Sequence, residues 1–297
     1  MTQDAIAAAI AAAAAQTPNM NEAQKGGGEW TPPAAGKCLV TLIGYIELGI
    51  QHVPASKTDP IKFPAKDEEQ VDLIFELSGK GHEPKEIDGK FYPERITVNL
   101  KKSLSEKAWF YKIFKVLNWD NSATHFAQLV GRHFLATVVH TKGKGDKVWA
   151  GFKLPTAQGG GYTFAAPTYN PVDPETQMPD VTIVKEFPKP RVYSEPRVFL
   201  WDYASREMWD SLYIDGMYDE RKDDKGNVIS PARSKNVIQN KIKAAKNFPG
   251  SPVAAIIGDE VLNVDTDDMA LGVDPDSLPD NSSAAADEDA ALAALGI

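Results

Sequence analysis

The feature that most limits the possible folds is a change of hydrophobic period within residues 36–154. In three successive segments apolar residues alternate with polar ones, which is the period-two pattern of half-buried β-strands. From Ser103 to Asn118 the apolar residues recur with the 3.6-residue period of a helix. Alternation then returns in two further segments. The expected strands are 37–50, 69–77, 93–100, 132–141 and 147–154.

The expected helix has a sequence signal at its start. Ser103 and Glu106 have the spacing of a capping box, in which each side chain accepts a backbone N–H of the first turn. Gly44 interrupts the first strand and indicates a bulge or bend. Three strands, a helix and two strands are the element order of an OB-fold. We therefore expect a mainly β protein with an OB-fold-like, five-stranded Greek-key barrel, whose helix lies between strands 3 and 4.

The chain is expected to have three parts. Residues 1–35 comprise an alanine-rich helix at 4–16 and a flexible linker rich in glycine and proline. Residues 36–258 form the main domain, and the composition of residues 259–297 predicts a disordered acidic tail. After the barrel, the main domain continues with two strands and two helices, expected at 181–187, 197–201, 203–213 and 234–247.

Charge is distributed unevenly along the chain, although the net charge is only −9. The tail contains 11 of the 41 acidic residues and none of the 32 basic residues, so residues 1–258 are close to neutral. Between Lys90 and Lys153 there are 12 basic and 4 acidic residues, and Pro231 to Phe248 contains no acidic residue. This asymmetry is typical of a polyanion-binding body with an acidic interaction tail, or of a solvated surface with a solubilising tail.

The sequence contains no recognisable catalytic or metal-binding motif. The five histidines lack HxxxH and HExxH spacing, and there is neither a Walker loop nor a nucleophile elbow. A single cysteine, Cys38, excludes an intrachain disulfide and is expected to be buried. No apolar run predicts a membrane span, and the N-terminus lacks the pattern of a secretory signal. We expect a soluble, intracellular protein without catalysis, cofactor or metal.

The remaining candidates form a binding constellation. Single-stranded nucleic acid is held by a cationic groove and by aromatic rings on which bases stack, with about 1–3 kcal/mol for each stacked base. Rings on the expected helix are assigned to the core, whereas rings on strands and loops are open to stacking or packing. The expected nucleic-acid-binding residues are Tyr45, Lys62, Phe91, Tyr92, Lys101, Lys102, Lys142, Lys144, Trp149, Phe152, Lys153, Tyr162, Phe164 and Tyr169.

The tail ends in an acidic run followed by an apolar tip. Such a segment can occupy the cationic groove of its own chain until nucleic acid displaces it, and it can dock on basic pockets of partner proteins. The alternative is a solubilising tail with a weak terminal helix. The expected partner-binding residues are Asp287, Glu288, Asp289, Leu292, Leu295 and Ile297.

Several segments of the main domain carry a resemblance to a known family. They are GYIELGIQ (44–51), VDLIFEL (71–77), YPERITVNLKKSLSEKAWFYKIFKVLNW (92–119), FLWDYASREMWDSLYIDG (199–216) and KNVIQNKIKAAKNFPGSP (235–252). In these segments the chain resembles the single-stranded DNA-binding proteins of tailed bacteriophages, which are OB-fold proteins with acidic C-terminal tails.

The resemblance implies sequence-independent binding of single-stranded DNA in the cytoplasm of an infected bacterial cell. It also implies protection of replication or recombination intermediates and recruitment of replication or recombination proteins through the tail. Two features depart from the family pattern. Ile297 stands where such tails commonly end in phenylalanine, and the alanine-rich N-terminal helix has no counterpart in that pattern.

Two other functions remain open. A virion or scaffolding protein would use the acidic tail and the alanine-rich helix for assembly, and would form ordered homo-oligomers with no preference for single-stranded DNA. A nuclease would need metal-binding carboxylates together at strand ends, for which Asp72 and Glu76 are the residues to test. The sequence pattern specifies no oligomeric state.

Overall fold

The computed structural model describes residues 31–56, 59–87, 89–142, 148–153, 164–222 and 226–258. Contacts divide the chain into two compact units, Met1–Pro32 and Pro33–Ile297. All described helices and strands belong to the second unit. The helix expected at 4–16 and the acidic tail from residue 259 lie outside the described residues.

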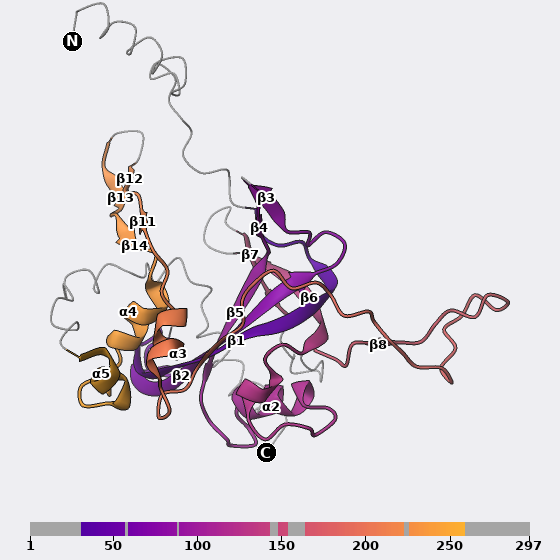
Figure 1. The fold of residues 1–297 in the computed structure, drawn as a ribbon, viewed down its shortest axis with the longest axis horizontal. Coiled ribbons are helices and arrows are strands. Elements are labelled where there is room, and N and C mark those ends of the chain that lie inside the picture. Colours follow the sequence, from indigo (N-terminus) through magenta and orange to yellow (C-terminus); the bar gives the residue numbers. More distant parts are fainter. Residues whose placement is uncertain are drawn as a thin grey trace, which may run out of the picture. The chain divides into compact units, whose positions relative to one another are not determined.

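A sheet of long strands forms the centre of the second unit (Figure 1). In the order β5-β2-β1-β6-β7, each strand pairs antiparallel with the next. The short strand β10 (Arg197–Phe199) pairs parallel to β1, beyond the last residue of β1 that pairs with β6. The protein is therefore mainly β, and each of the five expected long strands is confirmed. They are β1 (Gly36–Val53), β2 (Lys66–Ser78), β5 (Arg95–Lys101), β6 (His133–Lys142) and β7 (Val148–Phe152).

Strands β5 and β7 are the two edges of this sheet. They lie close to each other, but no ladder of hydrogen bonds joins them in the described residues. The closure that would complete the predicted barrel is therefore not found. Helix α2 (Trp109–Leu117) and the 3₁₀ helix η1 (Phe126–Leu129) lie between β5 and β6 in the chain.

Helix α2 begins later than predicted. Its first turn has no side-chain cap, and the Ser103 Oγ accepts only the N–H of Ser105, at 3.4 Å. The predicted capping box is therefore wrong. The reason is that the side chains that the core buries begin only at Phe110 and continue with Ile113 and Leu117.

Strand β1 is buried on both faces because it separates two hydrophobic cores. Its register with β2 shifts between Leu42 and Gly44, which confirms the bulge predicted at Gly44. One inserted residue exchanges the faces of all the side chains that follow it. As a result, Leu42 and Tyr45 both lie in the first core, whereas Ile46 belongs to the second.

The C-terminal segment builds the second core together with β1 and Ile74 of β2. Figure 1 shows its three helices, α3 (Arg206–Ser211), α4 (Val237–Lys243) and α5 (Pro252–Ile257), grouped beside one end of these strands. The Ser205 Oγ caps α3 by accepting the Met208 N–H, at 3.2 Å. The periodicity does not predict α5, which has only six residues. The buried members of this core are Ile46, Leu48, Phe199, Trp201, Trp209, Leu212, Ile242, Ala245, Phe248, Val253 and Ile257.

The other strands are two or three residues long and form local hairpins. The pair β3–β4 lies between β2 and β5 in the chain, and the strand predicted at 181–187 is reduced to β9. No helix in the described part of the chain has the length and hydropathy needed to span a membrane. The short strands are β3 (Lys85–Ile87), β4 (Lys90–Tyr92), β8 (Thr168–Tyr169), β9 (Lys185–Glu186), β11 (Met217–Tyr218), β12 (Arg221–Lys222), β13 (Val228–Ser230) and β14 (Arg233–Ser234).

Candidate nucleic-acid interface

Three of the predicted stacking rings lie inside the first core, and their assignment to nucleic acid is corrected. Tyr45 is fully buried, and Phe152 and Phe164 are 6% and 5% exposed. The Tyr45 ring stacks on Phe126, while the other two rings pack against Phe75. The bulge in β1 turns Tyr45 inward. A ring without an exposed face has no surface on which a base can stack.

The two adjacent lysines predicted for the groove are paired with acids. The Lys102 Nζ lies 2.8 Å from the Glu47 Oε1, and the Lys101 Nζ lies 3.7 Å from the Glu68 Oε2. Glu47 compensates Lys102, whereas Glu68 compensates Lys101 only in part, because the Lys66 Nζ lies nearer to it, at 2.7 Å. Both lysines therefore add less to a cationic surface than the sequence predicts. With Tyr45 buried as well, these three residues expected to bind nucleic acid are engaged within the chain.

The other predicted residues fall into three groups. Trp149 is half-buried, and Tyr169 packs on Phe187 with 4.7 Å between ring centroids. Lys144, Tyr162 and the tail residues Asp287, Glu288, Asp289, Leu292, Leu295 and Ile297 lie outside the described residues and stay predictions. The exposed ones are Lys62, Phe91, Tyr92, Lys142, Lys153 and Tyr169.

Phe91 is the predicted ring around which the structure brings other binding groups together. It lies on β4, is 44% exposed, and has its ring centroid 5.1 Å from that of Tyr193. The Arg191 guanidinium lies 4.8 Å from the Tyr193 ring centroid and 6.0 Å from that of Phe91. A cation over an aromatic face is attracted by the ring quadrupole. We call Phe91, Arg191 and Tyr193 the ring–arginine cluster.

A buried carboxylate on β2 positions the segment that carries two members of this cluster. The two oxygens of Glu76 accept the backbone N–H groups of Tyr193 and Ser194, each at 2.8 Å. Glu76 is fully buried and lies opposite Arg95 of β5 in the strand register. The same carboxylate therefore holds Tyr193 in place and brings the cluster next to Arg95.

Two arginines, Arg95 and Arg197, extend the positive charge of the cluster. Burial lowers the pKa of the Arg197 guanidinium, the positive charge of Arg95 lowers it further, and Glu195 acts in the opposite direction. Within the described ranges, no carboxylate lies at ion-pair distance from Arg95, Arg191 or Arg197. Positive charges held close together, with no carboxylate at ion-pair distance among the described residues, favour the binding of an external anion such as phosphate.

Cation–ring contacts also occur outside the cluster. The Arg132 guanidinium is 4.6 Å from the ring centroid of Trp119, which is 39% exposed. Asp120 accepts two hydrogen bonds from Arg132, at 3.1 and 2.8 Å, and these bonds lower the pKa of the Asp120 carboxyl to about 2. The Tyr218 ring lies beside two cations, whose charged groups are 5.3 and 5.6 Å from its centroid. These two cations are Arg233 and Lys235.

The Asp120–Arg132 pair predicts a specific pH dependence of stability. An aspartate with a depressed folded-state pKa binds fewer protons in the folded than in the unfolded chain, so stability rises with pH through this range. The contribution is fully present above pH 3.8 and is lost as the pH falls through about 2. We expect the stability of the wild-type chain to fall more steeply below pH 3.8 than that of D120N. Urea unfolding at a series of pH values measures the free energy of unfolding of both proteins. Parallel plots of this free energy against pH would contradict the expectation.

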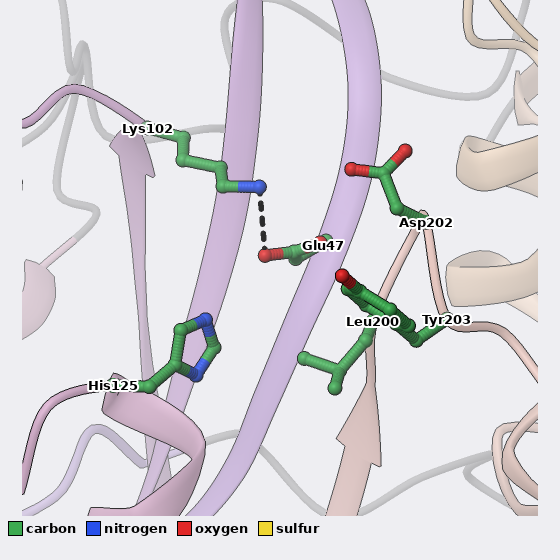
Figure 2. Close-up of a pocket in the computed structure, with 6 residues that line it drawn as sticks. All are labelled: Glu47, Lys102, His125, Leu200, Asp202 and Tyr203. Carbon is green, nitrogen blue, oxygen red and sulfur yellow. Dashed lines mark ion pairs between the residues drawn. The ribbon is translucent and has the colours of Figure 1, made fainter.

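A second feature of the surface is a hollow of about 300 Å³ (Figure 2). At its centre Glu47 accepts hydrogen bonds from the Tyr45 hydroxyl, the Trp201 N–H and the Lys102 ammonium, each at 2.8 Å. Burial by itself raises the pKa of Glu47, but these three hydrogen bonds lower it below its usual value. The central charges are therefore satisfied within the chain. The hollow is lined by Glu47, Lys102, His125, Leu200, Asp202 and Tyr203.

The carboxylates named for a nuclease have structural partners. Both oxygens of Glu76 are engaged by backbone N–H groups, as described above. Asp72 accepts the Asn99 amide at 2.7 Å and lies 3.8 Å from the Lys241 ammonium. No group of three or more metal-ligating side chains is found in the part of the chain that the structure describes. These positions therefore hold the sheet and the C-terminal segment together.

Sequence reasoning misses Arg191, Tyr193 and Arg197. Residues 188–197 read PKPRVYSEPR, and a signal was available in the arginines that surround one tyrosine in this proline-rich segment. The segment lies outside the basic stretch 90–153. Only its long-range contacts with Glu76 and Phe91 bring it to the interface.

Comparison of the chain with models of protein families, with curated proteins and with solved structures finds no match. The functional argument therefore depends on the geometry of the interface itself. That geometry consists of the exposed Phe91 ring and the half-buried Tyr193 ring beside arginines that have no ion-paired acid among the described residues.

Proposed function

We propose that the chain is a sequence-independent single-stranded DNA-binding protein of the phage type, built on an OB-fold and acting without catalysis. The sheet order is compatible with this fold. An OB-fold is a five-stranded, partly open Greek-key barrel. Here the first, second and third long strands are neighbours, the fourth pairs with the first, and the fifth pairs with the fourth. In the chain, helix α2 follows the third long strand and precedes the fourth, and this order supports the proposal.

One observation carries the proposed function. The ring–arginine cluster combines two rings, of which Phe91 is 44% exposed, with an arginine over both, and Arg95 and Arg197 extend its charge. Bases stack on aromatic faces and phosphates bind guanidinium groups, and neither contact requires a particular base. The arrangement therefore suits single strands of any sequence, whose bases are free to stack.

The proposal is tested by titrating labelled oligo-dT with the protein and following fluorescence anisotropy at two salt concentrations. We expect tight binding. The logarithm of the association constant should fall linearly with the logarithm of the salt concentration, with a slope of about −0.7 for each phosphate neutralised. Replacing Phe91 by alanine should weaken binding by about tenfold, because a stacking platform is lost. R191A should weaken binding and also reduce the salt slope by about 0.7.

The matched control is K101A, which removes an exposed lysine whose charge is already paired with Glu68. We expect it to change affinity much less than R191A does. A duplex of the same length should compete poorly. Binding that is independent of salt, or equally strong for duplex, would contradict the proposal. In that case the virion or scaffolding function would be favoured.

The acidic tail lies outside the described residues, and its roles stay part of the proposal. We propose that it recruits replication or recombination proteins through its acidic run and apolar tip. Charge supports this role, because the tail carries 11 acidic residues and no basic residue. A chain ending at Gly258 should bind oligo-dT at least as tightly as the full chain and should lose the partner interaction.

A further inference from the structure

The segment from Pro167 to Phe187 is an ordered arm of the chain. At its base, the Phe187 N–H donates to the Pro167 carbonyl at 2.8 Å, and β8 pairs with β9. Further out, the Asn170 side chain donates to the Ile183 carbonyl at 2.8 Å, and the Asp180 N–H donates to the Pro171 carbonyl at 2.8 Å. Figure 1 shows the chain beyond β8 reaching away from the sheet. We call this segment the acidic arm.

The acidic arm exposes large apolar side chains. Val181 is 79% exposed and Met178 is 68% exposed, although hydrogen bonds fix the backbone that carries them. Exposed apolar residues that gather on one ordered element are typical of an interaction surface. The exposed apolar residues of the arm are Tyr169, Val172, Met178, Val181, Ile183 and Val184.

The charge of the arm selects its kind of partner. It contains four acidic residues and only one basic residue, Lys185, so it repels nucleic acid. Its partner must therefore present apolar surface together with uncompensated positive charge. The acidic residues of the arm are Asp173, Glu175, Asp180 and Glu186.

The chain itself presents a surface of that chemistry. The hairpin β3–β4 exposes Ile87, Phe91 and Tyr92, and next to Phe91 lies Arg191, which has no ion pair among the described residues. This surface contains the ring–arginine cluster and the exposed lysines that bound β3 and β4. Its one described carboxylate, Glu86, lies opposite Phe91 in the strand register, and the two lysines together with Arg191 outnumber it. The described part of this surface is therefore apolar with a net positive charge, whereas the arm is apolar and negative.

We propose that the acidic arm of one copy docks on the ring–arginine cluster of a second copy. The inference builds on the proposed function because it assigns a second, protein ligand to the same surface. Docking buries the exposed valines and the Phe91 ring, and it supplies carboxylates to Arg191. Self-association and single-stranded DNA then compete, so binding to DNA releases the protein from its own oligomers.

Sedimentation velocity of the full chain over a concentration series tests the inference without DNA. We expect reversible self-association that weakens when salt rises from about 50 mM to about 500 mM, because the charges are screened. The variant M178S/V181S/V184S should associate at least about tenfold more weakly, since it loses the apolar anchors. Its thermal midpoint should equal that of the wild type, because these side chains are exposed.

The matched control is V228S/I229S, which removes two exposed apolar side chains from the hairpin β12–β13. It should associate like the wild type, whereas R191A should associate more weakly. A wild type that stays monomeric, or an arm variant that associates as strongly as the wild type, would overturn the inference.

Added oligo-dT separates the two proposals. Dissociation of the wild-type oligomer by oligo-dT supports both. If the protein self-associates through the arm but does not bind oligo-dT, the proposed function is contradicted and the docking of the arm is supported. Binding of oligo-dT by oligomers that do not dissociate overturns the docking face proposed here.

Discussion

Replacing Glu47 by alanine is expected to reduce the free energy of unfolding by about 3–5 kcal/mol, because several buried donors lose their acceptor at once. Glu47 is 4% exposed and accepts hydrogen bonds from the Tyr45 hydroxyl and the Trp201 N–H, both at 2.8 Å. It connects β1 of the first core to the start of the segment that builds the second. Lys102 is 30% exposed, so its ammonium regains water and adds less to this cost.

The variant E47Q separates charge from hydrogen bonding. Glutamine keeps an acceptor for the Trp201 N–H but loses the charge that faces Lys102, so we expect a smaller loss than in E47A. The folded-state pKa of Glu47 is lowered, so its contribution is present above pH 4.5 and is lost as the pH falls below that value. Stability should therefore depend less on pH in E47Q than in the wild type in the acid range.

Urea unfolding followed by circular dichroism measures both changes. The control is E69A, which removes an exposed carboxylate on β2 and should alter stability by less than about 0.5 kcal/mol. If E47A were as stable as E69A, Glu47 would not be the connection between the two cores that we describe.

Replacing Gly49 by alanine is expected to cost about 3–5 kcal/mol, the sum of backbone strain and a collision. Gly49 has a φ of +72°, a conformation that residues with a Cβ rarely adopt. A Cβ at this position would lie 2.4 Å from the Trp201 ring and 2.7 Å from the Asn247 Oδ1. That oxygen accepts the Ile50 N–H at 2.7 Å, so moving it away breaks a hydrogen bond between β1 and the C-terminal segment.

The control for Gly49 is Gly89, which has a φ of +73° and open space, with no atom within 4 Å, where a Cβ would lie. G89A therefore carries the backbone strain without the collision. We expect G49A to unfold at a clearly lower urea concentration than G89A. Equal midpoints for the two variants would mean that Trp201 and Asn247 move aside without cost.

The local pattern of the chain predicted the strands well and the interface poorly. Alternation at Val71, Leu73 and Phe75 is enough to predict β2, because a half-buried strand must place every second residue on its buried face. The same reasoning failed at Tyr45. It lies after the bulge at Gly44, and a one-residue shift exchanges the two faces of all that follows.

The interface required contacts between segments far apart in the chain. Phe91 meets Tyr193 across about a hundred residues, and Tyr193 is held by Glu76, which is 117 residues away from it. The hydrophobic periodicity of the sequence predicts neither contact. The prediction that Lys101 and Lys102 bind nucleic acid failed to account for their acidic partners for the same reason. These partners lie on other strands.

By itself, the sequence determined the five long strands, the bulge at Gly44 and the uneven distribution of charge, because each is a property of neighbouring residues. The tertiary structure alone decided which rings are buried and which cations keep their charge uncompensated. Burial and ion pairing depend on groups that folding brings together from distant parts of the chain. Folding buried Tyr45 and paired Lys102 with Glu47, whereas it brought Phe91, Arg191 and Tyr193 together in one cluster.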